Sequence, residues 1–399
     1  MKKILKIWSI ILIIAILMCD TKIYAYDGEE LTEDDIREVI STAAQLQILS
    51  KAALVYDRTY GKILYEKNID EKLPNASTTK ILTAIVAYEN ANMDDMVTVS
   101  QKAAGTGGST INLRKGNKVL LGDLMKGLLI CSGNDAAVAI AEHVGGSVEE
   151  FCNMMNQKAR ELGANDTNFL TPHGLDKEGH YTTARNLMIF ADYLLNISYL
   201  AEIVNMQTAT MKIDDYTKSL RTTNEMLGIY ENADGLKTGF TNKAGRCLVT
   251  SITQDGRQLI TIVLGCDTKK QRTKETIQLI NYGYSEYEVV DIYEKMRKNI
   301  EISIEKTAVK EYEISISGKK MMLLEKNKNG NLTYKYNINK KLVAPIEKGE
   351  KIGEIEVYLE TTLINVIEIR VPVEIKRKTV VEYFFEILDG QKQYIQLKV

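Results

Sequence analysis

The order of the hydrophobic patterns along the chain constrains its fold more than any single motif. Helical periodicity dominates from residue 120 to about 195, with a loop near 163–181. Strand patterns lie on both sides of this helical part, at 52–57, 62–67, 235–240, 246–253 and 258–265. Because strands begin and end the segment while helices lie between them, we expect one sheet built from both of its ends.

Other patterns predict what surrounds this sheet. Residues 81–87 are mostly apolar and predict a buried helix, 93–108 predict a loop-rich crossing, and 270–284 predict a closing helix. A pattern close to a capping box predicts a further helix over 32–47. The first domain is therefore expected to be mixed α/β, of the α+β kind, with an antiparallel sheet flanked by helices.

The remainder of the chain has a different pattern. Alternating polar and apolar residues at 311–316 and 352–358 predict short strands and a small, separate β-rich domain. The charged stretch 294–298 is expected to be the linker. The expected organisation is a signal peptide (1–25), a first domain (26–297), a β-rich domain (298–376) and a tail (377–399).

The first 25 residues predict export. Three lysines precede an apolar run of about 13 residues, and Ala25 offers a small residue at a plausible cleavage point. The run is shorter than the roughly 20 residues that a membrane-spanning helix needs. We therefore expect a cleaved signal peptide rather than an anchor.

Charge and histidine content argue against two classes of partner. The chain of 399 residues has 51 Lys and Arg against 53 Asp and Glu, so it lacks the basic excess of a nucleic-acid-binding protein. Two of its three histidines lie in the Gly-rich stretch 173–180, for which we expect loop hydrogen bonding rather than a metal site. No nucleic-acid partner, metal or cofactor is expected.

Ser77 and Lys80 are the first candidates for chemistry. Side chains three residues apart at a helix start share one face, with Cβ atoms about 5–6 Å apart, so the amine can reach the hydroxyl. The first turn also presents free N–H groups to developing negative charge. The pattern alone is weak, because it recurs in β-patterned segments at 303–306 and 317–320.

Two further short motifs strengthen the case. Together with Ser77-Thr-Thr-Lys80 they are called the first, second and third islands, in chain order. Ser132-Gly-Asn134 lies at a loop-to-helix transition, and Lys237-Thr-Gly239 lies on a predicted strand. With the first pair, they resemble the S-x-x-K, S-x-N and K-T-G elements of the active-site serine penicillin-recognising enzymes, in the same order. That resemblance implies a β-lactamase/transpeptidase-like domain.

Longer stretches narrow the resemblance. Residues 168–176, 179–185 and 234–240 are similar to the low-molecular-mass penicillin-binding proteins that act as serine-type D-alanyl-D-alanine carboxypeptidases. The similarity covers roughly 52–284, and the following β domain resembles the C-terminal module of that family. It implies removal of the terminal D-Ala from peptidoglycan stem pentapeptides, on the outer side of the cytoplasmic membrane, and covalent inhibition by β-lactam antibiotics.

The chemistry of such a reaction assigns roles to the first two islands. Ser77 would attack the carbonyl and form an acyl-enzyme. Lys80 would be the base, which requires a neutral amine, and both burial and the nearby charge of Lys237 favour that form. Ser132 would pass a proton to the leaving amine, and Asn134 would hold the substrate amide.

The third island is expected to bind the substrate. Backbone N–H groups of Ser77 and Phe240 would form the oxyanion hole. Gly239 leaves room for a substrate laid along the strand edge. By resemblance, Lys237, Thr238 and Arg272 would bind its free carboxylate. Arg272 is the least secure of the three, because a surface charge is the alternative interpretation.

Three alternatives remain open. A β-lactamase is suggested superficially by Glu161 and Asn165, although we interpret that stretch as a helix exit ending at Gly163 and expect slow release of a penicilloyl adduct. A D,D-endopeptidase of the same fold and a non-catalytic penicillin- or wall-binding protein are the other two. Measuring D-Ala release would separate these possibilities.

The tail has two interpretations. Val381, Phe384, Phe385 and Leu388 fall on one helical face, as in a helix that lies on a membrane surface. Acidic residues in the same stretch would repel anionic lipids, which favours a tail packed on the protein. Peripheral contact with the cytoplasmic membrane is therefore left open.

Overall fold

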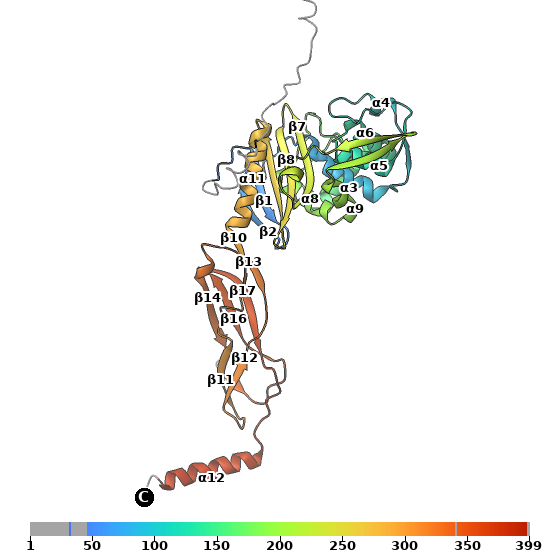
Figure 1. The fold of residues 1–399 in the computed structure, drawn as a ribbon. Coiled ribbons are helices and arrows are strands. Elements are labelled where there is room, and N and C mark those ends of the chain that lie inside the picture. Colours follow the sequence, from blue (N-terminus) through green and yellow to red (C-terminus); the bar gives the residue numbers. More distant parts are fainter. Residues whose placement is uncertain (1–31, 33–45, 340, 397–399) are drawn as a thin grey trace, which may run out of the picture. The chain divides into compact units, whose positions relative to one another are not determined.

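The computed structural model describes Thr32 and residues 46–339 and 341–396, and the chain forms two compact units, Met1–Gly283 and Tyr284–Val399 (Figure 1). The predicted signal peptide lies outside the described residues, as does almost all of the helix predicted over 32–47. Each unit has its own hydrophobic core and is described separately below.

The first unit is built on a five-stranded antiparallel sheet in the order β2-β1-β9-β8-β7. β1 pairs with β9, with Leu54 opposite Ile262, so both ends of the segment contribute to one sheet as the sequence predicts. The strands are β1 (Ala52–Asp57), β2 (Lys62–Lys67), β7 (Ala233–Thr241), β8 (Gly245–Gln254) and β9 (Arg257–Cys266).

Helices cover both faces of this sheet (Figure 1). Because side chains alternate along a strand, Val55 packs toward α11 while its neighbour Leu54 joins the main core. α3 lies inside that core and is buried from Lys80 to Ala87. The long helices are α3 (Lys80–Asn90), α5 (Leu121–Leu129), α6 (Asn134–Gly145), α7 (Val148–Glu161), α8 (Ala184–Leu195), α9 (Ser198–Asn205) and α11 (Lys269–Ser285).

Short elements complete the first unit. The crossing predicted over 93–108 contains a strand and a short helix, and an unpredicted hairpin follows α9. Within the described part of the chain no single helix meets the length and hydropathy of a membrane span, and α8 with α9 meets them only as a pair bent by 105°. The short elements are η1 (Ala76–Thr79), β3 (Met96–Thr98), α4 (Gln101–Ala104), β4 (Lys118–Leu120), β5 (Thr208–Ile213), β6 (Tyr216–Arg221) and α10 (Met226–Ile229).

The second unit is β-rich and ends in one helix. Its strands form three small sheets, β10-β13, β12-β11-β15 and β14-β16-β17. Their bounds are β10 (Tyr287–Asp291), β11 (Asn299–Glu305), β12 (Glu311–Ser315), β13 (Met321–Glu325), η2 (Asn329–Asn331), β14 (Leu332–Ile338), β15 (Leu342–Val343), β16 (Lys351–Leu359), β17 (Thr362–Arg370) and α12 (Val380–Gln396).

The division between the units falls earlier than the expected boundary at 297/298. β10 pairs with β13, and Ile292 and Met296 are buried in the second core. The charged stretch 294–298 is therefore a turn inside the second unit, because its one apolar residue, Met296, anchors it there. A run of charged residues indicates an exposed segment, and in sequence an exposed turn cannot be distinguished from a linker between domains.

Candidate active site

Ser77 and Lys80 meet where η1 runs into α3. Ala76, immediately before Ser77, has a φ of +48°, a left-handed conformation that costs a non-glycine residue energy. Lys80 begins α3 with its side chain completely buried. Its Nζ lies 2.7 Å from Ser77 Oγ, so the structure brings the predicted pair together.

Lys80 has two more hydrogen-bond partners. Its Nζ lies 2.7 Å from Asn134 Oδ1 and 2.9 Å from the carbonyl oxygen of His173. Both partner atoms can only accept hydrogen bonds. The amine is thus held between two carbonyl-type acceptors and the Ser77 hydroxyl.

The second island stands at the start of α6. Asn134 is the first residue of that helix, is buried, and donates from Nδ2 to the carbonyl oxygen of Gly107. Ser132 is buried two residues earlier with a φ of +62°. Asp135 accepts hydrogen bonds from the backbone N–H groups of Ile111 and Leu113, which ties the preceding loop to the helix.

The third island is on β7, an edge strand of the five-stranded sheet. A methyl group on Gly239 would lie 3.0 Å from Ser77 N and 3.1 Å from Asn75 O, so only glycine lets this strand approach the nucleophile so closely. Lys237 is buried and Thr238 Oγ1 lies 2.7 Å from Thr223 Oγ1.

The two lysines of the site have depressed pKa values. Burial, and then the positive charge of Lys237, hold the pKa of Lys80 well below its ordinary value, while Asp135 opposes the shift. Burial and the charge of Arg272 lower the pKa of Lys237 to about 7. Both groups therefore lose protons far more readily than a solvated lysine does.

Phe240 and Arg272 complete the predicted set. Phe240 is about half exposed, and the Arg246 guanidinium lies over its ring at 3.8 Å. Arg272 is not a surface charge: it is buried on α11 and ion-paired with Glu225. Burial alone would raise the pKa of Glu225, but Arg272 and the Thr273 hydroxyl keep it below its usual value.

Two contributors to the site had no signal of their own in the sequence. The His173 carbonyl is a backbone atom, and any residue at that position would supply one. Glu225 immediately precedes the short helix α10 and is far from Arg272 in the chain. Only a three-dimensional arrangement could reveal either.

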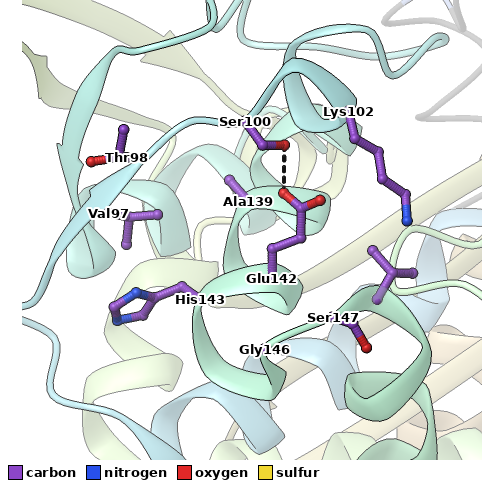
Figure 2. Close-up of a pocket in the computed structure, with 10 residues that line it drawn as sticks. Val97, Thr98, Ser100, Lys102, Ala139, Glu142, His143, Gly146 and Ser147 are labelled. Carbon is purple, nitrogen blue, oxygen red and sulfur yellow. Dashed lines mark hydrogen bonds between the residues drawn. The ribbon is translucent and has the colours of Figure 1, made fainter.

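A separate hollow of about 300 Å³ lies at the other end of α6 (Figure 2). It is lined by Glu142 and His143, some 12 Å along the helix from Asn134 at about 1.5 Å per residue. Its Ser100 hydroxyl donates to the Glu142 carboxylate at 2.6 Å, rather than facing an amine. The pairing of hydroxyl and buried amine seen at Ser77 is not repeated there.

Models of known protein families match both parts of the chain. A family model described as D-alanyl-D-alanine carboxypeptidase matches residues 39–268, more than half of the chain. The chain belongs to this family. A second model, described as the C-terminal domain of penicillin-binding protein 5, matches residues 287–378. The protein is therefore a serine peptidase, and its β-rich unit matches the module expected from the sequence.

Individual relatives agree. D-alanyl-D-alanine carboxypeptidase DacF of Bacillus subtilis is 34% identical over 311 residues, which cover 76% of this chain and 80% of DacF. DacC of Escherichia coli is 33% identical, covering 78% and 80% of the two chains.

Solved structures also match. That of DacD from Francisella tularensis has a TM-score of 0.67 and 29% identity, covering 85% of this chain and 96% of its own. Penicillin-binding protein 5 of Haemophilus influenzae gives a TM-score of 0.64 at 29% identity, covering 84% and 99%.

Proposed function

We propose that this carboxypeptidase family member is an exported enzyme that removes the terminal D-Ala from peptidoglycan stem pentapeptides through a Ser77 acyl-enzyme. The observation that carries the proposal is the buried Lys80 amine, 2.7 Å from the Ser77 hydroxyl and with a depressed pKa. A neutral amine beside a hydroxyl is what nucleophilic activation requires.

The partners of Lys80 suit the neutral form. A neutral amine has two N–H donors and one lone pair. The donors are used by Asn134 Oδ1 and the His173 carbonyl, which leaves the lone pair for the Ser77 O–H. As Ser77 Oγ bonds to the substrate carbonyl carbon, its proton passes to Lys80.

Stabilisation of the oxyanion is assigned to backbone donors. The N–H groups of Ser77 and Phe240 would point at the carbonyl oxygen as it gains charge. The edge position of β7 supports this role, since an extended substrate can lie along it like an added strand.

Breakdown of the tetrahedral intermediate completes the cycle. The carbon–nitrogen bond breaks, and Ser132 passes the proton held by Lys80 to the departing D-Ala amine. A water molecule then adds to the acyl carbon, and Ser77 leaves with its proton restored. Asn134 would meanwhile hold the amide of the acyl portion.

The free carboxylate of the substrate would bind at Lys237 and Thr238. With a pKa near 7, Lys237 gains its proton readily when an anion arrives. The charge of Arg272 is already balanced by Glu225, so we assign it an electrostatic contribution through Lys237 rather than the direct contact expected from the sequence.

The geometry gives less support to a β-lactamase. Glu161 ends α7, is exposed, and accepts a hydrogen bond from Gln157, while Gly163 has the positive φ of a helix exit. The Glu161 carboxylate is therefore hydrogen-bonded at the helix surface rather than to Ser77 or Lys80. We therefore expect β-lactams to acylate Ser77 and to be released slowly.

Two measurements test the function. We expect D-Ala release from a stem pentapeptide, abolished by Ser77→Ala, and an intact-mass increase after benzylpenicillin that maps to the peptide containing Ser77. Ligand retention without D-Ala release would instead indicate a binding protein. Rapid turnover of benzylpenicillin would indicate a β-lactamase, and cleavage of cross-links alone an endopeptidase.

The proposed location is the cell envelope, on the outer side of the cytoplasmic membrane. The predicted signal peptide supports export. The large apolar side chains of α12 are exposed, including Val380 at 85% and Phe384 at 60%. This exposure supports peripheral membrane contact over the alternative of a packed tail.

A further inference from the structure

His180 is a buried imidazole with no part in the reaction described above. Only 6% of it is exposed, and its ring stacks on Phe169 with centroids 5.0 Å apart. Burial lowers the pKa of His180 to about 4, with Asp176 opposing and Lys177 adding to the shift, so the ring is neutral at pH 7.

The hydrogen bonds of His180 determine its tautomer. The backbone N–H of Leu170 donates to Nδ1 at 3.0 Å, so Nδ1 carries no proton. We therefore assign the proton of the neutral ring to Nε2, which lies 3.0 Å from Thr79 Oγ1 and donates to it.

Thr79 leads to the same assignment independently. Its hydroxyl lies 2.8 Å from the carbonyl oxygen of Ala76, to which it must donate its only proton. It can then only accept from its other neighbours, Asn75 Nδ2 and His180 Nε2, both at 3.0 Å. The chain of donors thus runs from His180 through Thr79 to Ala76.

The Ala76 carbonyl shares its peptide plane with the Ser77 N–H, a proposed oxyanion donor. A peptide unit is planar, so the direction of the Ala76 C=O also sets the direction of the Ser77 N–H. Ala76 is held at a φ of +48°, which it would not adopt unaided. Gly174 covers the same carbonyl, where a Cβ would come within 1.8 Å.

We propose that His180 is a positioning residue that, through Thr79 and the Ala76 carbonyl, directs the Ser77 N–H into the oxyanion hole. The inference rests on the proposed function, because it concerns a donor to that reaction. His180 also joins the loop before it to η1 through Leu170 and Thr79, which packs that loop against the nucleophile.

Two amide variants separate these roles. Gln at this position can place its Nε2 where the imidazole Nε2 stands, so His180→Gln retains the donor to Thr79. Asn can place an oxygen near the Nδ1 position, so His180→Asn retains the acceptor for Leu170 and loses the donor. Thr79→Val, nearly equal in shape, removes the donor to Ala76 while keeping His180.

The test is the rate of Ser77 acylation by benzylpenicillin, followed by intact mass at several concentrations in the full chain. We expect His180→Asn and Thr79→Val to lower the limiting rate by about tenfold or more, toward the roughly hundredfold cost of losing a whole oxyanion donor. The concentration for half-maximal rate should change little, and His180→Gln should stay within about threefold of the wild type.

Thermal unfolding followed by circular dichroism shows which variants are folded. Folded His180→Asn and Thr79→Val proteins that acylate at the wild-type limiting rate would overturn the inference alone. If His180→Asn does not fold, Thr79→Val decides by the same criterion. Absence of acylation in the wild type would overturn the proposed function, and this inference with it.

Discussion

Lys80 and Lys237 place two basic groups in one water-excluded site, where each positive charge makes another less favourable. Lys237 is the second cause, after burial, of the depressed Lys80 pKa. The neutral fraction of Lys80 at a given pH therefore depends on the charge of its neighbour.

Removing that charge should alter the pH dependence of acylation. In Lys237→Met the charged form of Lys80 is less unfavourable, so the Lys80 pKa rises and less neutral amine is present at each pH. We expect the acid limb of the benzylpenicillin acylation profile to move to higher pH. The exposed Lys115→Met is the matched control and should leave the limb in place; equal profiles for both variants would refute the electrostatic coupling.

The part of the candidate site that could be predicted from sequence consists of side chains. Ser77 with Lys80, and Asn134 with the amine, are brought within hydrogen-bonding distance by segments far apart in the chain. Backbone contributions could not be predicted, because a carbonyl such as that of His173 leaves no trace in residue type. Arg272 could be predicted as a site residue from the family resemblance, but its partner Glu225 could not.

At the scale of elements, strongly patterned segments were predicted well. The hairpin β1–β2 has the expected bounds, and β7, β8 and β9 differ from them by a few residues. The hairpin β5–β6 was missed because few of its residues are apolar: only Met211, Ile213 and Leu220 are buried. Its strands are specified by tertiary contacts more than by local pattern.

An ion pair joins Arg272 on α11 to Glu225, the residue immediately before α10. Arg272 is almost fully buried and Glu225 is largely so, with side-chain exposures of 5% and 19%. Removing one partner of such a pair leaves the other charge buried without compensation. The positive charge of Arg272 also contributes to lowering the pKa of Lys237.

We expect Glu225→Gln to lower the free energy of unfolding of the first unit by about 3 kcal/mol, the lower end of the range for broken buried pairs. Urea unfolding followed by circular dichroism measures this, with the exposed Glu231→Gln as control. A loss in Glu225→Gln no larger than in the control would show that solvent or a rearranged neighbour compensates Arg272.

In the chain as a whole, the candidate active site and the exposed apolar helix α12 belong to different units. Every residue assigned to the proposed reaction lies in the first unit, and α12 belongs to the second. The sequence predicted a two-domain chain, but it placed the boundary too late because a charged turn resembles a linker. The arrangement predicts that membrane binding and acylation can be altered independently.

The described part of α12 has two distinct faces. Val381, Phe384, Phe385 and Leu388 recur at helical spacing and are exposed. Glu382 and Glu386 lie four residues apart on another face, and Glu386 is paired with Lys378 at 2.7 Å. The carboxylates therefore do not interrupt the apolar stripe, which weakens the objection that they would repel a membrane.

This geometry, together with the proposed membrane contact, predicts which substitutions would weaken binding to lipid. Burying a phenylalanine contributes about 1.5–3 kcal/mol, so Phe384→Glu with Phe385→Glu should lower binding to phosphatidylglycerol-containing vesicles by roughly a hundredfold or more. Glu382→Gln, which lies beside the apolar stripe and not in it, should change it little, and benzylpenicillin acylation should be unaffected in both. Vesicle co-sedimentation of the full chain measures the partition. Undiminished sedimentation of the double variant would show that the exposed stripe is not what contacts the membrane.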